Sequence, residues 1–194
     1  MLVFMRHGKD NSKHRDKHDP PLVDGAEAQI RRKTRYLAQK YGFPDIIFYS
    51  PMRRCRQTHE IVISELMSMG AEMPEYHRDK RLSRYFFDKE KLSPKINRRT
   101  WSENIPITET KGEFKIRVRD FCDEMSSLSE FENIWCITHT KVFLSIMDMV
   151  GEKSRYLEFA DHMVIDKSNM GSKINPRHRG TSHTGNRRRY VSKR

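Results

Sequence analysis

LVFMRHG at residues 2–8 joins a short apolar run, Leu2–Met5, to two basic side chains and a glycine. Two further apolar runs are followed by polar residues in the same way. Ile46–Tyr49 precedes a serine, a proline and arginines, and Ile134–Ile137 precedes a threonine and a histidine. An apolar run without alternation is typical of a strand that helices cover on both faces. We therefore predict three buried strands with polar residues at their carboxyl ends.

Helical patterns lie between and after these runs. Apolar side chains recur at helical spacing in residues 25–41, 53–69 and 112–126, and residues 140–150 are apolar on most sides. Because strands and helices alternate, the sequence predicts an α/β fold, a three-layer α/β/α arrangement with a mostly parallel central sheet. Residues 1–176 form the predicted domain.

Two segments depart from this alternation. Residues 78–111 contain many charges, two prolines and little periodicity, and we interpret them as an inserted loop or lid. Residues 177–194 are polar and basic, and we expect a flexible C-terminal tail there.

The charge of the chain is unevenly distributed. The 194 residues carry a formal net charge of +12, yet residues 167–194 hold nine Lys and Arg with no Asp or Glu, which leaves +3 on residues 1–166. A weak contact with a nucleic acid or another acidic partner is therefore expected through the tail.

The composition also indicates a compartment. No apolar run approaches the roughly 20 residues that a membrane span needs, so no membrane partner is expected. The first apolar run has no basic segment before it, unlike a signal peptide. Cys55, Cys122 and Cys136 form no CxxC motif, which disfavours a disulfide framework or a structural zinc site. We predict a cytoplasmic protein.

Basic side chains and histidines gather where the predicted strands end. Arg6 and His7 follow the first run, Arg53 and Arg54 follow the second, and His139 follows the third. Ligand sites of open α/β sheets lie beyond the carboxyl ends of the strands. Arginine matches phosphate oxygens, and a histidine ring nitrogen can act as a nucleophile. The pattern predicts a phosphoryl-transfer site that needs no metal and no cofactor.

The chain resembles the histidine phosphatase (phosphoglycerate mutase-like) superfamily in five segments that occur in the family's order. The first contains the RHG signature, the third resembles its S-P-L-x-R segment, and the last holds its second histidine. These segments are MRHGKD at 5–10, HDPPLVDGAEAQ at 18–29, YSPMRRCRQTHEI at 49–61, GEFKIRVRDF at 112–121 and WCITHTKVF at 135–143. The resemblance implies a phosphoglycerate mutase-like fold and a metal-independent phosphatase.

The resemblance also implies roles for single residues. His7 would be the catalytic nucleophile that becomes phosphohistidine, and Arg6, Arg54 and His139 would form the phosphate pocket. Arg54 is preferred over Arg53 because it occupies the arginine position of S-P-L-x-R.

Further site residues have more peripheral roles. Gly8 would let the backbone turn closely beside the phosphate, and Asn11 would contact phosphate or substrate. Arg84 stands where the family's L-x-E segment places an acidic general acid, so it is assigned to phosphate or substrate binding. Asp88 and Glu90 are the nearby candidates for the acid that protonates the leaving group.

Several alternatives remain open. The substrate would be a phosphorylated small molecule or a phosphoprotein, including one with phosphohistidine. A phosphoglycerate mutase-type phosphotransferase would use the same pocket. A catalytically weak protein could instead bind a phosphorylated ligand or nucleic acid through the pocket and residues 187–189. His14 and His18 are interpreted as exposed loop residues, and no metal ligand is predicted.

Overall fold

The computed structural model describes residues 1–16, 19–84, 109–153, 155 and 157–168. Five strands form one sheet in the order β3-β2-β4-β1-β5. Neighbours are parallel except β5, which runs antiparallel to β1. The strands are β1 Leu2–Arg6, β2 Ile46–Tyr49, β3 Glu75–Arg78, β4 Ile134–Thr138 and β5 His162–Ile165.

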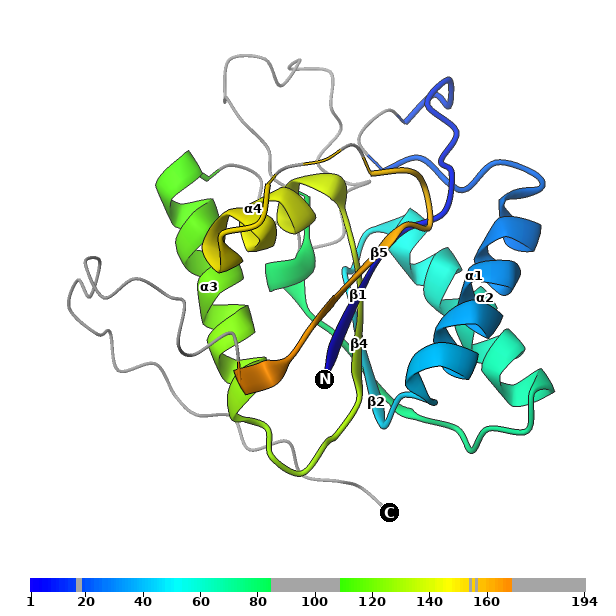
Figure 1. Cartoon of the computed structure of the whole chain (residues 1–194). Helices are drawn as coiled ribbons and strands as arrows, with labels where there is room; N and C mark the ends of the chain where they lie inside the picture. The colour runs from blue at the N-terminus through cyan, green and yellow to red at the C-terminus, as the bar shows by residue number, and fades with distance from the viewer. Residues whose placement is uncertain (17–18, 85–108, 154, 156, 169–194) are drawn as a thin grey trace.

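Helices cover both faces of this sheet, as Figure 1 shows. On one face lie α1 (Ala26–Tyr41) and α2 (Arg53–Ser68). On the other lie α3 (Lys111–Ser127) and α4 (Thr140–Val150). The predicted three-layer fold with a mostly parallel sheet is confirmed, and the helices begin and end within two residues of the predicted bounds.

Alternate residues of each inner strand face different helices. Along β1, Leu2 and Phe4 join the cluster packed on α3 and α4, whereas Val3 and Met5 join the cluster packed on α1 and α2. The ring of Phe4 makes edge contacts with Phe121, at 6.5 Å between ring centroids. Because both faces are covered, every position of such a strand is apolar, which explains the unbroken runs in the sequence.

The two edge strands were not predicted. β3 has the sequence EYHR, and none of its residues is fully buried. β5 has the sequence HMVI and alternates between half-buried and buried residues. A short edge strand with one covered face carries no continuous apolar run, so its sequence resembles a loop.

The structure describes both ends of the predicted insertion, residues 78–84 and 109–111. Its first residue closes β3, a 3-10 turn (η1, Lys80–Leu82) follows, and Thr110 caps α3 through a capping box with Glu113. Residues 85–108, with Asp88 and Glu90, and the predicted tail at 177–194 lie outside the described residues. Among the helices that are described, none combines the length and apolar character needed to cross a bilayer.

Candidate active site

Three strand ends place a histidine–arginine cluster at one edge of the sheet. His7 follows β1, His139 follows β4, and Arg54 lies in the first turn of α2 after β2. The register aligns these ends, because Arg6 pairs with Thr138 and Tyr49 pairs with Ile137. The structure therefore brings His7, Arg54 and His139 together, as expected from the strand pattern.

The guanidinium of Arg54 lies between the two imidazoles. Its Nε donates to Nε2 of His7 at 3.2 Å, and its Nη2 lies 3.2 Å from Nδ1 of His139. The two imidazole centroids are 5.1 Å apart. Arg54 is 2% exposed, so its charge is held in a desolvated position where an anion would be bound strongly.

The hydrogen bonds of His7 define its tautomer. Nδ1 lies 2.7 Å from the carbonyl oxygen of Gly8, which can only accept, so Nδ1 carries the proton. Nε2 then holds the lone pair and points toward Arg54. The ring nitrogen available as a nucleophile is therefore Nε2, on the side of the anion-binding guanidinium.

His139 has the opposite arrangement. Its Nδ1 faces the guanidinium of Arg54, a pure donor, so Nδ1 accepts and Nε2 carries the proton. That N–H lies 3.0 Å from the hydroxyl oxygen of Ser50, which accepts it. Ser50 thus orients the second histidine, a role that sequence analysis did not assign although Ser50 lies in the quoted motif.

Burial keeps both histidines neutral. It lowers the pKa of His7 well below its ordinary value, and the positive charge of Arg54 lowers it further. The pKa of His139 is lowered well below its ordinary value by the same two causes in the same order. A neutral His7 keeps its nucleophilic lone pair at physiological pH.

Cys55 lies beside His139 but is not positioned as a nucleophile. Its Sγ is 3.4 Å from Nε2 of His139, and the side chain is fully buried. Burial raises the pKa of the thiol to about 12, so the thiolate is not populated near neutral pH.

Arg6 and Arg84 place further positive charge around the cluster. Arg6 donates through Nη1 to the carbonyl of Leu157 at 2.5 Å, and its guanidinium lies 3.9 Å from the ring centroid of Phe159. Burial, and then the charge of Arg54, lower the pKa of Arg84. Both arginines contribute to lowering the pKa of His7.

Gly8 lies where the chain passes closely over α1 and α2. Its N–H donates to Oγ1 of Thr58 at 3.0 Å, and that hydroxyl donates to the carbonyl of Arg54 at 2.7 Å. A Cβ at this position would lie 2.5 Å from Cδ1 of Ile30. Asn11 accepts from the backbone N–H of Lys13 at 3.2 Å, within its own turn, so its contact with phosphate stays a prediction.

Two carboxylates beside Arg54 were not predicted. Oδ2 of Asp10 is 3.5 Å from Nε of Arg54, and Oδ1 of Asp19 is 3.6 Å from Nη1. Oδ1 of Asp19 also accepts the backbone N–H of Arg53 at 2.8 Å. Burial raises the pKa of Asp19. Both aspartates lie in the quoted motifs, but no feature of their spacing distinguishes them from ordinary loop carboxylates.

No group of histidine, cysteine or acidic side chains within the described ranges has the arrangement of a metal site. His14 accepts the backbone N–H of Asp16 through Nδ1 at 3.0 Å, within a local turn. His18 lies outside the described residues.

Comparison with known proteins identifies the family. The model of the histidine phosphatase superfamily (branch 1) matches residues 2–160. A search of curated proteins finds no match.

Solved structures share the fold at low sequence identity. The alpha-ribazole phosphatase from Shigella flexneri is 19% identical with a TM-score of 0.60, over 86% of this chain and 91% of that one. A mycobacterial glucosyl-3-phosphoglycerate phosphatase in complex with VO3 is 15% identical with a TM-score of 0.60, over 83% and 88%. A phosphoserine phosphatase from Entamoeba histolytica is 16% identical with a TM-score of 0.54, over 83% and 87%.

Proposed function

Because this chain is an enzyme of the histidine phosphatase superfamily, we propose that it hydrolyses a phosphorylated substrate through a covalent intermediate on His7. The observation that carries the proposal is the orientation of His7, whose unprotonated Nε2 faces the buried guanidinium of Arg54. Three relatives of the same fold are phosphatases of phosphorylated metabolites by name. We therefore expect a phosphorylated small molecule or phosphoprotein as the substrate.

In the first step, Nε2 of His7 attacks phosphorus, the P–N bond forms, and the bond to the leaving oxygen breaks. Arg54 and Arg6 stabilise the charge on the three equatorial oxygens of the transferring group, and His139 joins them once its Nδ1 takes up a proton beside the bound phosphate. In the absence of phosphate, the N–H groups of Arg54 point at the two imidazoles. When phosphate binds, these N–H groups donate to its oxygens instead. The leaving oxygen receives a proton from a general acid.

In the second step, water attacks the phosphorus of phosphohistidine and the P–N bond breaks. The group that protonated the leaving oxygen accepts the proton from this water, so it returns to its starting state. Inorganic phosphate leaves, and His7 recovers its lone pair. Both steps use protein groups alone.

The general acid belongs to this proposal. Asp88 and Glu90 remain candidates and lie outside the described residues. Among the described carboxylates, Asp19 combines proximity to Arg54 with a pKa that burial raises, which favours the protonated form. Asp10 is equally close to Arg54.

The His7 proposal is tested by comparing the wild type with His7→Ala on p-nitrophenyl phosphate and on a phosphohistidine protein. Loss of the nucleophile is expected to lower kcat/KM by at least about a thousandfold. Rapid quenching of the wild type should trap acid-labile phosphate on His7. Equal activity in the two proteins would remove the proposal. Arg53→Gln, beside but outside the pocket, serves as the matched control and should retain activity.

Four variants identify the acid: Asp10→Asn, Asp19→Asn, Asp88→Asn and Glu90→Gln. Loss of the acid should lower kcat by about a hundredfold on an alkyl phosphate and much less on p-nitrophenyl phosphate, whose leaving group needs little protonation. The variant with this substrate-dependent loss identifies the acid. If all four lose activity equally on both substrates, none of the four is the acid.

Two alternatives use the same pocket. A phosphoglycerate mutase-type phosphotransferase would move phosphate between two positions without net release of inorganic phosphate. A binding protein would hold a phosphorylated ligand or nucleic acid with no turnover. Release of one inorganic phosphate for each substrate molecule consumed, lost in His7→Ala, would favour the hydrolase over both alternatives.

A further inference from the structure

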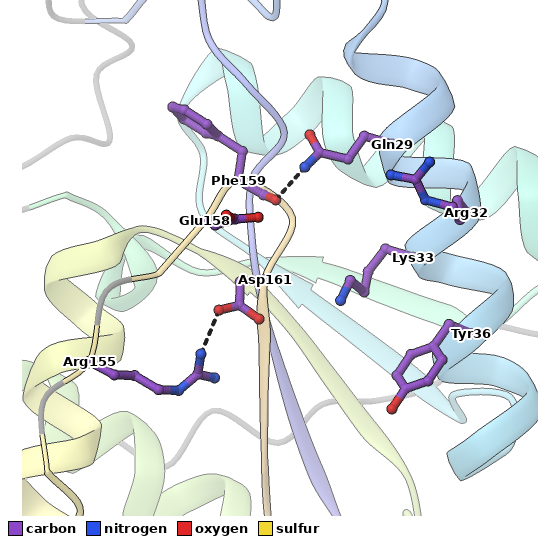
Figure 2. A pocket seen from close by; sticks show the side chains of 8 residues that line it. All are labelled: Gln29, Arg32, Lys33, Tyr36, Arg155, Glu158, Phe159 and Asp161. Atoms are coloured by element: carbon purple, nitrogen blue, oxygen red, sulfur yellow. Dashed lines mark hydrogen bonds and ion pairs between the residues drawn. The ribbon is translucent and has the colours of Figure 1, made fainter.

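A second pocket lies outside the His7 cluster. It has a volume of about 530 Å³ and lies between α1 and the segment that leads into β5. Figure 2 shows Gln29, Lys33 and Tyr36 on the α1 side, with Arg155 and Asp161 opposite. Its volume lies in the range of small-molecule sites.

The cations of this pocket differ in how they are paired. On the far wall, Nη1 of Arg155 is 2.8 Å from Oδ2 of Asp161, so that pair is internally neutralised. On the α1 wall, Arg32 and Lys33 form no ion pair with any carboxylate in the described part of the chain. One further carboxylate, that of Glu158, lines the pocket.

Lys33 instead contacts a histidine of β5. Its Nζ lies 3.3 Å from Nδ1 of His162, which must accept because an ammonium only donates. Burial, and then Lys33, lower the pKa of His162. A neutral imidazole leaves the charge of Lys33 uncompensated, so an anion in the pocket gains a full ionic partner.

Tyr36 provides a flat wall beside these cations. Its side chain is 41% exposed, and its ring is held by Lys40, whose Nζ donates to the phenol oxygen at 2.9 Å. The imidazole of His162 lies 5.5 Å away in an edge orientation. A partly exposed ring whose phenol oxygen is hydrogen-bonded can stack against a planar group without losing much conformational freedom.

We propose that this pocket binds a small anionic molecule with one flat ring. Its phosphate, phosphonate or carboxylate group contacts Arg32 and Lys33, and its ring lies on Tyr36. The site is separate from the phosphoryl-transfer site, because its lining comes from α1 and from Arg155, Glu158, Phe159 and Asp161. Binding at this site does not require the role proposed for His7.

Phe159 contacts both sites. Its carbonyl accepts from Nε2 of Gln29 at 2.8 Å in the second pocket (Figure 2). Its ring lies under the Arg6 guanidinium and 5.9 Å from the ring of His7. Backbone hydrogen bonds from Arg6 N–H to the carbonyl of Asp161 at 2.8 Å and from Ala160 N–H to the carbonyl of His7 at 3.1 Å also join the two segments.

Phenylphosphonate is a suitable probe because its C–P bond resists phosphatases and it combines an anion with a flat ring. Amide chemical shifts of the full chain would be followed by NMR during titration. Two groups of shifts with separate isotherms are expected, one around Gln29, Lys33 and Phe159, the other around Gly8 and His139. The double variant Arg32→Gln, Lys33→Met should weaken the first isotherm by at least about tenfold and leave the second unchanged.

Lys115→Gln, which removes an exposed cation of α3 on the opposite face of the sheet, is the matched control and should preserve both isotherms. Methylphosphonate, which lacks the ring, should bind the second pocket more weakly than phenylphosphonate. The proposal is overturned if the pocket amides do not shift, or if their isotherm survives the double variant. Equal affinity for the two phosphonates would overturn the placement of a ring on Tyr36.

Discussion

At the scale of single residues, the sequence reveals groups whose chemistry is distinctive and conceals those whose chemistry is common. Histidines and arginines directly after buried strands are unusual, so the meeting of His7, Arg54 and His139 could be predicted. Asp10 and Asp19 could not, because a loop carboxylate is ordinary and its approach to Arg54 depends on tertiary contacts such as the backbone hydrogen bond from Asn11 to Pro21.

Gly8 offers a residue-scale prediction. Gly8→Ala places a methyl group 2.5 Å from Cδ1 of Ile30. We expect a loss of about 1–3 kcal/mol in the free energy of unfolding. Activity should also fall, because relief of the clash would displace the backbone at residue 8 and with it the neighbouring His7. Ile30→Val removes that Cδ1 atom. Urea unfolding should show that the double variant loses less than the sum of the two single variants. Simple additivity would mean that the clash is absent.

At the scale of elements, the interior of the sheet was predictable and its edges were not. β1, β2 and β4 are covered on both faces and therefore carry continuous apolar runs. β3 and β5 each have one neighbour and depend on tertiary contacts for their conformation. The contact between α2 and the β3 edge illustrates this. The ring of His59 in α2 stacks on Tyr49 with centroids 4.2 Å apart, and its centroid lies 4.9 Å from that of Tyr76 in β3.

His59 gives a pH-dependent prediction at this scale. Burial lowers its pKa to about 4, from an unfolded value near 6.5, so the folded state binds fewer protons between these values. Its contribution to stability is complete above pH 6.5 and is lost as the pH falls toward 4. Urea unfolding of His59→Phe should therefore show about 2 kcal/mol less destabilisation than the wild type between pH 7.5 and pH 5.

The same substitution should cost little at pH 7.5. Nε2 of His59 is buried without a hydrogen-bond partner among the described residues, so a phenyl ring of similar shape leaves no polar group unsatisfied there. Parallel pH profiles for the two proteins would show that His59 is not the titrating group.

At the scale of the whole molecule, the excess of positive charge lies in a different part of the chain from the segment that matches the family. The family match covers residues 2–160, whereas nine basic residues without an acidic one lie in 167–194. Composition alone could predict this division, because it requires no knowledge of how side chains pack. The role of the basic segment in binding acidic partners stays a prediction.

Removal of residues 177–194 tests that division. The segment holds seven Lys and Arg. We expect kcat/KM on p-nitrophenyl phosphate to stay within about twofold, while binding to duplex DNA weakens. The slope of log K against log salt should become shallower by as much as about six, and by about three when only Arg187, Arg188 and Arg189 are changed to Gln. Unchanged DNA binding after truncation would remove the tail from this role.

The direction of β5 has a practical consequence. It starts opposite Met5 and ends at Ile165 opposite Leu2, so the backbone leaves the sheet at the rim farthest from the histidines. The amino group of Met1 contacts the carbonyl of Glu132 at that same rim. A fluorophore or an affinity handle joined at Met1 would therefore lie at the rim of the sheet opposite to the one that carries His7 and His139.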